Sequence, residues 1–260
     1  MNPESARIFV ILSALGLVGC SGDGGAPQAD AGNDPGFSNG GSGGSSASAC
    51  SAPGEAIDPT ALIDDMEDQN ALVLMNGERS GGWWAAGDGT TGASIVPEPG
   101  GPALPEVIPG GRCGSQYAMH VTGQGFTDWG ALLGMNLAYD SSGGAFYDGS
   151  AYEGIGFWAR IGDTSTNTIR VAISDANSEP KGGKCVEGGG AGEGCFDTFG
   201  VTISTLDTDW VKYEVPFRGL SQRNYGLKAE ALDTKTLFTV GFNVEPNTVF
   251  DLWIDDVSFY

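Results

Sequence analysis

Acidic side chains are crowded at two places that lie far apart along the chain. Asp65 and Glu67 follow a short apolar run, and Asp255 and Asp256 stand inside the apolar and aromatic stretch from 249 to 260. Oxygen ligands of this kind suit a hard cation, Ca²⁺ first. If the first and last strands pair in one sheet, the two groups meet, and we expect these four carboxylates to bind one structural calcium ion. A solvated acidic rim is the other interpretation, because runs of charge are usually solvated.

The last stretch of the chain is typical of a central β-strand. Strand alternation sends Phe250, Leu252 and Ile254 to one face and Trp253 to the other, so both faces carry large apolar groups. A strand of this kind is expected to be covered on both sides. Asp256 continues one apolar face, and an unpaired buried carboxylate costs several kcal/mol. A cationic partner is therefore expected beside it.

The residues that catalysis would need are scarce. The chain has one histidine, His120, and no Gly-x-Ser-x-Gly sequence, so a Ser-His-Asp triad has little support. Glycosidases need two carboxylates that flank the scissile bond, whereas the acids outside the two groups above are scattered through loops. Nucleotide-binding, zinc-protease and redox motifs are also absent from the sequence. We expect a protein without catalytic residues.

Binding of a sugar asks for other residues, namely aromatic platforms for the apolar face of a pyranose and planar polar groups for its hydroxyls. The polar faces of the middle strands offer such a set, with aromatic side chains at its edges. The predicted ligand-binding residues are Asn136, Trp158, Arg160, Arg170 and Asn243, with Trp129, Tyr152 and Tyr225 as edge platforms. Two alternatives stay open: the aromatic side chains could pack in the core, and the two arginines could pair with acids across strands. Trp83 and Trp84 are adjacent, so at most one of them is a core residue.

Period-2 alternation, Gly-rich connections and almost no helical periodicity predict an all-β fold, an antiparallel β-sandwich of the jelly-roll type. In residues 237–245, for example, Val240 and Phe242 oppose Thr239 and Asn243. The expected strands are 61–66, 83–86, 93–96, 116–122, 131–138, 152–161, 168–175, 199–204, 210–217, 237–245 and 249–259.

The N-terminal residues predict export rather than structure. An apolar run ends at Leu17-Val18-Gly19-Cys20, which resembles a bacterial lipobox, so residues 1–19 are predicted to be a lipoprotein signal peptide and Cys20 the lipidated residue. An ordinary secretory signal is the alternative. Residues 20–49 are rich in Gly, Ser and Ala and are predicted to be a flexible linker. The remaining residues, 50–260, form one predicted domain, on a protein anchored in the outer membrane or at the cell surface.

Four further cysteines suggest disulfides in an exported chain. Cys185 and Cys195 bracket a Gly-rich loop that a local disulfide would close, and Cys50 would then pair with Cys113. Three pairings are possible from the sequence. A zinc site is the weaker interpretation, because the spacing is wrong and one histidine is available.

The charge balance excludes several kinds of partner. The chain has a formal net charge of −21, with 12 Lys and Arg against 33 Asp and Glu. Nucleic acids and anionic lipid surfaces are bound through Lys and Arg, so neither is an expected ligand. The membrane is expected to be reached through the lipid anchor alone.

Four segments together resemble those of a known family. They are residues 62–68, 147–160, 210–217 and 249–260, and the match that they form in this order extends over most of residues 61–260. In this order they resemble the calcium-containing jelly-roll carbohydrate-binding modules of the galactose-binding-like superfamily. The Gly-rich loop 185–195 and the Pro- and Gly-rich segment 97–111 depart from that pattern, which leaves the identity of the ligand open.

The resemblance implies a monomeric, non-catalytic module that binds a glycan in a groove on one sheet of a calcium-stabilised sandwich. Two alternatives remain: a surface interaction or structural lipoprotein with this fold and no sugar site, and a polysaccharide-active hydrolase that uses loop carboxylates.

Overall fold

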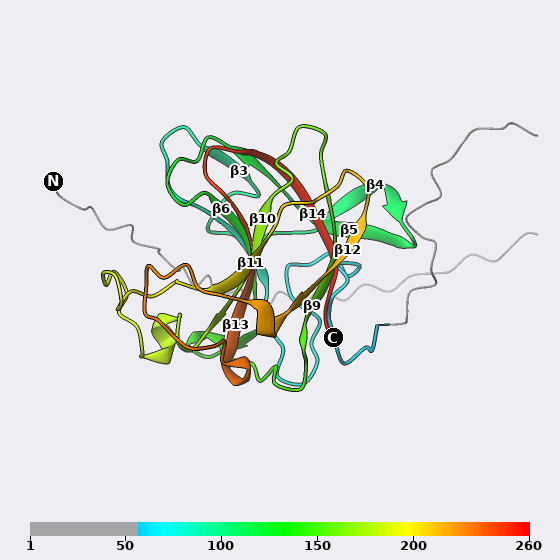
Figure 1. Ribbon diagram of the computed structural model, residues 1–260. Helices are drawn as coiled ribbons and strands as arrows, with labels where there is room; N and C mark the ends of the chain where they lie inside the picture. Colours follow the sequence, from blue (N-terminus) through cyan, green and yellow to red (C-terminus); the bar gives the residue numbers. More distant parts are fainter. Residues whose placement is uncertain (1–56) are drawn as a thin grey trace, which may run out of the picture.

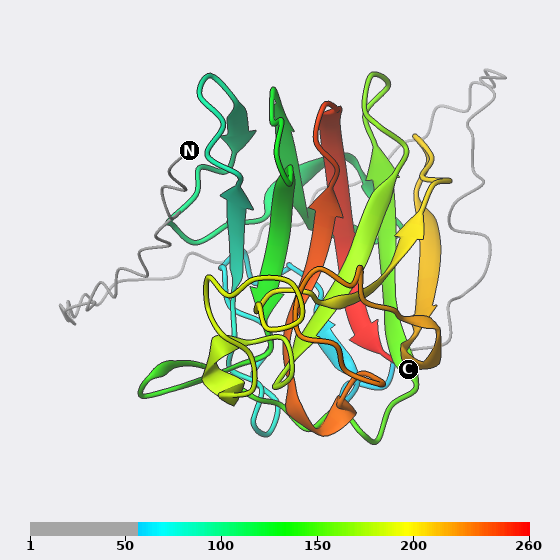
Figure 2. The ribbon, with the colours of Figure 1, turned by 60° about the vertical axis from the view of Figure 1, so that its left-hand side comes forward.

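Two antiparallel sheets form the body of residues 57–260, the part of the chain that the computed structural model describes (Figure 1). The seven-stranded sheet has the order β12-β9-β14-β5-β3, with β1 paired to β14 and β4 paired to β5. The five-stranded sheet has the order β11-β10-β13-β6-β2, and it faces the viewer in Figure 2. The predicted antiparallel sandwich is confirmed. Residues 1–19, the linker 20–49, Cys20 and Cys50 lie outside the described residues.

The strands of the seven-stranded sheet are β1 (Leu62–Asp64), β3 (Ser94–Val96), β4 (Glu106–Arg112), β5 (Ser115–Gln124), β9 (Gly154–Ile161), β12 (Val211–Pro216) and β14 (Val249–Phe259). Those of the five-stranded sheet are β2 (Trp83–Gly87), β6 (Ala131–Asn136), β10 (Ile169–Asp175), β11 (Phe199–Ile203) and β13 (Leu237–Val244). A small hairpin joins β7 (Ala138–Asp140) and β8 (Gly143–Ala145), and three short 3₁₀ turns are η1 (Pro180–Gly182), η2 (Phe217–Gly219) and η3 (Thr234–Thr236).

Each of the eleven predicted strands overlaps an observed one, whereas β4, β7 and β8 were not expected. The segment that becomes β4 contains Pro109, Gly110 and Gly111, residues that are poor strand formers. It is held by packing instead, because Ile108 is buried against Trp210 and Trp253. Local propensity is overridden here by tertiary contact.

The core lies between the sheets and is built by the alternation that the sequence indicates. Phe157 of the seven-stranded sheet meets Phe242 of the five-stranded sheet edge-on, with ring centroids 5.0 Å apart. On the other side of Phe242, the ring of Trp83 stacks at 6.3 Å. All three side chains are buried. The inner face of each sheet therefore packs in the core, and its outer face makes other contacts.

The strand β14 has a central position. It pairs with β9 and β5 along its length, and β1 pairs with its C-terminal part through Leu62 opposite Ser258 and Asp64 opposite Val257. The expected meeting of the first and last strands is therefore confirmed.

One carboxylate from this meeting point is buried in the core. Asp64 is fully buried and accepts hydrogen bonds from Trp83 Nε1 at 2.7 Å and from the Met66 amide at 2.9 Å. Burial raises the pKa of Asp64 to about 7, and the two hydrogen bonds offset only part of that effect. The protonated carboxyl is thus favoured by folding.

We expect Asp64 to make the protein less stable as the pH rises. Its pKa in the folded chain, about 7, lies above the ordinary value of 3.8, so the stabilisation is complete below pH 4 and is lost as the pH rises through 7. The loss should be on the order of a few kcal/mol, at about 1.4 kcal/mol per pKa unit. Urea unfolding at pH 5 and pH 8 measures it, and Asp64→Asn should show a smaller difference between the two pH values.

Asp88→Asn is a matched control. Burial alone would raise the pKa of Asp88, but hydrogen bonds from Thr90, Asp128 and Gly130 outweigh it and lower the pKa to about 2. Asp88 is therefore ionised at both pH values, and its variant should keep the wild-type difference. An unchanged difference in Asp64→Asn would contradict the prediction.

Candidate functional site

The outer face of the five-stranded sheet is crossed by a row of small residues. Strand register places Gly134, Gly241, Ala172 and Gly200 side by side on β6, β13, β10 and β11, and Trp84 of β2 ends the row. We call these four residues the small-residue row. With strands about 4.8 Å apart, the distance from β2 to β11 is roughly 19 Å.

Larger side chains lie flat over the small-residue row. A Cβ atom on Gly134 would come within 2.8 Å of the Trp84 ring, and one on Gly200 within 2.9 Å of Arg170 Cζ. On Gly241 it would come within 2.7 Å of Leu132 Cδ1. Glycine is therefore required at these positions, because neighbouring side chains approach the backbone too closely for a Cβ atom. The outer face is consequently flat, and the neighbouring side chains lie parallel to the sheet.

Trp84 is the aromatic platform of this face. Its half-buried ring rests on Gly134, and its Nε1 donates a hydrogen bond to Asn136 Oδ1 at 2.7 Å. The hydrogen bond fixes the orientation of the ring and also orients the Asn136 amide. An indole held in this way can stack against the apolar face of a ring-shaped ligand.

Polar groups stand beside the platform in the neighbouring row. Register pairs Arg170 with Asn243, and both point outward. The Arg170 guanidinium is 7% exposed and donates from Nη2 to the carbonyls of Ser221 (2.6 Å) and Thr198 (3.3 Å). Burial lowers its pKa. Asn243 Oδ1 is buried and accepts no hydrogen bond from the described residues, so a ligand hydroxyl would reach it only after the amide turns outward.

The β11 end of the face is bordered by two loops, 176–198 and 217–236, which lie in front of the lower part of the sheet in Figure 2. Arg223 forms an ion pair with Glu245 there. The side chain of Tyr225 is 53% exposed, and its hydroxyl donates to the carbonyl oxygen of Phe196. The predicted residues Asn136, Arg170, Asn243 and Tyr225 thus belong to one side of the sandwich.

Trp158 and Arg160 lie on the opposite side. They point outward from the seven-stranded sheet, where register places Trp158 beside Asp255 and Arg160 beside Trp253. The prediction that they share a groove with Asn136, Arg170 and Asn243 does not hold, because period-2 alternation identifies an outward face without identifying its sheet.

On the seven-stranded side, arginine and tryptophan side chains alternate. Arg160 Cζ lies 4.9 Å from the Trp253 ring centroid and 5.3 Å from that of Trp210. Arg112 Cζ lies 4.8 Å from Trp158 and 5.6 Å from Trp210. The tryptophan rings of these cation–π contacts pack together with Ile108 of β4. They give Trp158 and Arg160 a packing role.

The two other predicted platforms differ in their surroundings. Tyr152 stacks on Phe259 with ring centroids 4.5 Å apart and donates to the Thr60 carbonyl at 3.2 Å, so it packs against the core. The ring of Trp129 is 45% exposed in the connection that precedes β6. Neither observation places Tyr152 or Trp129 in contact with Trp84.

His120 has both ring nitrogens next to carboxylates. Nδ1 lies 2.8 Å from Glu106 Oε2 and Nε2 lies 2.9 Å from Asp251 Oδ1, while the ring stacks on Trp253 at 3.8 Å. Neither nitrogen is left to activate a nucleophile.

The four predicted calcium ligands are engaged in other contacts. Arg112 Nε donates to Asp255 Oδ2 at 2.8 Å, and Arg112 Nη2 forms an ion pair with Asp256. Glu67 Oε1 accepts from the Gln116 amide at 2.8 Å, and Asp65 accepts from the amide of Glu67. Burial raises the pKa of Asp255 to about 6 although Arg112 lowers it in part.

This arrangement does not fit a divalent cation. The oxygen atoms that would bind calcium receive hydrogen bonds from arginine, backbone and hydroxyl donors, and Ser115 Oγ lies within hydrogen-bond distance of both Glu67 and Asp255, to either of which it can donate. Within residues 57–260, no group of three or more His, Cys, Asp or Glu side chains could hold a metal ion. Arg112 supplies the positive charge that the sequence assigns to an ion.

The predicted local disulfide is confirmed: Cys185 and Cys195 are bonded, with their Cα atoms 5.0 Å apart. Cys113 is also disulfide-bonded, and its predicted partner Cys50 lies outside the described residues.

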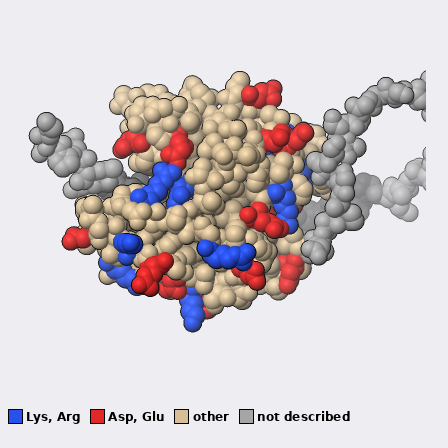
Figure 3. All heavy atoms as spheres, in the orientation of Figure 1, with Lys and Arg blue, Asp and Glu red and all other residues tan. Residues whose placement is uncertain are grey.

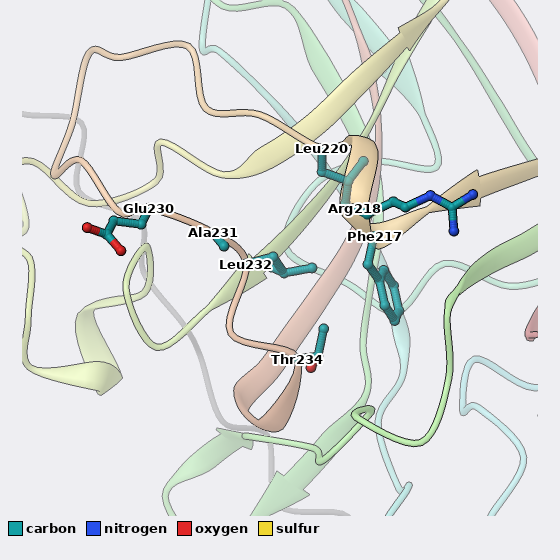
Figure 4. A pocket seen from close by; sticks show the side chains of 7 residues that line it. All are labelled: Phe217, Arg218, Leu220, Glu230, Ala231, Leu232 and Thr234. Carbon is teal, nitrogen blue, oxygen red and sulfur yellow. The ribbon is translucent and has the colours of Figure 1, made fainter.

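A hollow of about 270 Å³ lies elsewhere, beside η2 (Figure 4). Phe217, Leu220 and Leu232 form its apolar floor, whereas Arg218 and Glu230 are exposed at its rim. It lacks the platform and the oriented amide groups of the five-stranded face, which we therefore take as the candidate site.

No family model and no curated protein sequence matches the chain. Similar folds exist among solved structures. A family 11 carbohydrate-binding module from Clostridium thermocellum, solved in complex with a β-1,3-1,4-mixed-linked tetrasaccharide, is 20% identical with a TM-score of 0.48, over 76% of this chain and 94% of that one. A family 30 carbohydrate-binding module is 15% identical with a TM-score of 0.48, over 77% and 98%. What those modules bind is a property of those modules.

Two features of the candidate site were not expected from the sequence. The small-residue row comes from four separate strands, and its alignment depends on register. Trp84 was recognised only as one of two adjacent rings that could be exposed. A search for small residues at outward strand positions would find the row once the pairing of the strands is known.

We expect Arg112→Ala to destabilise the protein by about 3–5 kcal/mol, since it leaves a buried carboxylate without its partner. The Asp255 side chain is 0% exposed and that of Arg112 is 4% exposed. Urea unfolding measures the loss. Arg218→Ala is the control: its side chain is 81% exposed and 4.0 Å from Glu153, so the change should be below about 0.5 kcal/mol.

The same contacts predict the response to chelation. Because Arg112 meets the charge of Asp255 and Asp256, EDTA should leave the Tm of the wild-type protein unchanged. A fall in Tm with EDTA that calcium reverses would show that an ion binds the folded chain after all.

Proposed function

We propose that this protein binds a polysaccharide, without cleaving it, on the outer face of the five-stranded sheet. The observation that carries the proposal is the ring of Trp84, which lies flat on Gly134 and is fixed by Asn136. A pyranose presents an apolar face of C–H groups, and a flat, oriented indole suits that face.

The polar neighbours of the platform suit hydroxyl groups. Asn243 Oδ1 is a buried acceptor without a donor among the described residues, and the Arg170 guanidinium is held by backbone carbonyls in a fixed position. A sugar hydroxyl can donate to the first once the Asn243 amide turns outward, and it can accept from the second. Fixed donors and acceptors lose little entropy on binding, which favours a specific interaction.

The charge of the protein supports a neutral ligand. The net charge is −21, and on the side of the molecule seen in Figure 3 the Lys and Arg side chains of the described residues are few and stand among Asp and Glu. Arg223, beside the face, is already paired with Glu245. On that side a polyanion would therefore meet carboxylates close to the basic groups.

One observation bears on the alternative of a hydrolase. Burial raises the pKa of Glu179 to about 7, and its carboxyl contacts Ser174 at the edge of the face; a general acid needs such a pKa. The neighbouring carboxylate, Asp175, is fully buried and accepts hydrogen bonds from Asn177 and Ser178 as well as from Asp233. It is not free to act as the second catalytic group, and we therefore favour binding without cleavage.

Tryptophan removal on each face tests the proposal. With a glycan that an array identifies for the wild-type protein, Trp84→Ala should weaken binding at least tenfold, as expected when a platform worth roughly 1.4 kcal/mol or more is removed. Isothermal titration calorimetry measures the affinity, and Tm shows that the variant is folded.

Trp158→Ala is the matched control, because it removes a half-buried tryptophan from the opposite sheet and should keep wild-type affinity. Absence of any glycan ligand would favour the surface interaction or structural alternative. Release of reducing sugar that is lost in Glu179→Gln would favour the hydrolase.

The chain is also proposed to be exported and anchored by lipid. The support is the apolar run followed by Leu17-Val18-Gly19-Cys20. Within residues 57–260, no helix has the length and apolar character to cross a bilayer. Acylation of Cys20 would hold the protein at a membrane surface, with the five-stranded face available to polysaccharide.

Cys20→Ser is expected to release the protein from membranes, because the acyl chains would be the attachment. Detergent phase partitioning and membrane fractionation of cells that express each form measure the change. Continued recovery of Cys20→Ser in the detergent phase would contradict a lipid anchor.

A further inference from the structure

Phe196 has an unusual backbone for a bulky residue. Its φ angle is +71°, in the left-handed region that side chains with a Cβ rarely adopt, and its side chain is 40% exposed. A strained backbone persists only where surrounding contacts impose it, and such positions concentrate at functional sites. Here the strain presents an aromatic ring to solvent, which packing does not require.

The contacts that impose this conformation are local and numerous. Cys195, the preceding residue, is bonded to Cys185. The Phe196 amide donates to the Ser178 carbonyl at 2.7 Å, and its own carbonyl accepts from the Tyr225 hydroxyl at 2.5 Å. The ring of Tyr225 is 53% exposed, so two solvent-facing aromatic residues are joined by one hydrogen bond.

Asp197 joins the two loops. It is 1% exposed, and its carboxylate accepts from the amides of Arg223 (2.9 Å) and Gly226 (3.1 Å). Its carbonyl accepts from Gln222 Nε2 at 2.7 Å. A Cβ on Gly226 would lie 2.4 Å from the Gly194 carbonyl oxygen, so the loops are in direct backbone contact.

These loops continue the small-residue row beyond β11. Gly200, the last member of the row, exchanges backbone hydrogen bonds with Ser221, and Arg170 Nη2 donates to the Ser221 carbonyl. The chain then passes through Arg223 to Tyr225. Aromatic groups therefore stand at two places on this side of the sandwich, Trp84 on β2 and the Phe196–Tyr225 pair on the loops that lead into β11 and border it.

We propose that Phe196 and Tyr225 form a second aromatic subsite, which binds a further pyranose unit of the same glycan chain through its C–H face, and that Asp197 and the Cys185–Cys195 disulfide position it. This inference rests on the proposed glycan binding at Trp84. Because the two aromatic groups stand on separate elements, β2 and the loops at β11, a short oligosaccharide reaches one subsite and a longer one reaches both.

A length series of oligosaccharides from the glycan that the wild-type protein binds tests the subsite. By calorimetry, wild-type affinity should rise about tenfold once the ligand is long enough to reach both subsites, the change that roughly 1.4 kcal/mol of stacking represents. Phe196→Ala and Tyr225→Ala should each lose most of that rise and keep wild-type affinity for the shortest ligand bound.

Val186→Ala is the matched control. Val186 is 54% exposed in the loop that the same disulfide closes, and it is not part of the aromatic pair. Its variant should keep the full rise. Reduction of the disulfide with a phosphine should lower affinity for long ligands in the wild type, with little further loss in Phe196→Ala.

Asp197→Ala distinguishes positioning from general destabilisation. It should lower affinity for long ligands as Phe196→Ala does, and the double variant should lose no more than either single variant, because the residues act as one unit. Wild-type length dependence in Phe196→Ala and Tyr225→Ala would overturn the subsite while leaving binding at Trp84 intact. A wild-type protein that binds no glycan would overturn both.

Discussion

A buried negative charge in the middle of a sheet has to be met by a positive one, and this requirement governs the central strand of the sandwich. Asp255 of β14 is fully buried, and Arg112 reaches it from the end of β4. The same arginine lies against Trp158 and Trp210. The Arg112 side chain thus balances the negative charge of Asp255 and links the β4–β5 hairpin to β14. It also packs on the tryptophan rings at the outer face of the seven-stranded sheet. That sheet is consequently committed to internal contacts on both faces.

The five-stranded sheet has a different character. Its inner face packs in the core, but its outer face has glycines where side chains would otherwise stand, and neighbouring groups lie down over them. Binding of a glycan on this face needs no metal, so the proposal stands on Trp84, Asn243 and Arg170 and not on the calcium that the sequence suggested. In the proposed function, the seven-stranded side contributes stability and the five-stranded side binds the ligand.

The sequence was a good guide to strands and faces, and a poor guide to long-range pairing. Alternation alone identifies Asn243 and Trp158 as outward residues, and both are. It cannot say that they belong to different sheets, since that depends on hydrogen bonds between strands far apart in the chain. Arg112 shows the same limit, because 143 residues separate it from Asp255. Phe196 gives no local signal apart from its place after a disulfide cysteine, and its exposure follows from contacts with Ser178 and Tyr225.

The position of β1 in the sandwich has a consequence for presentation. The strand β1 lies beside β14 in the seven-stranded sheet, whereas Trp84 lies on the outer face of the other sheet. An attachment that acts through β1 would therefore hold the sheet opposite the proposed binding face.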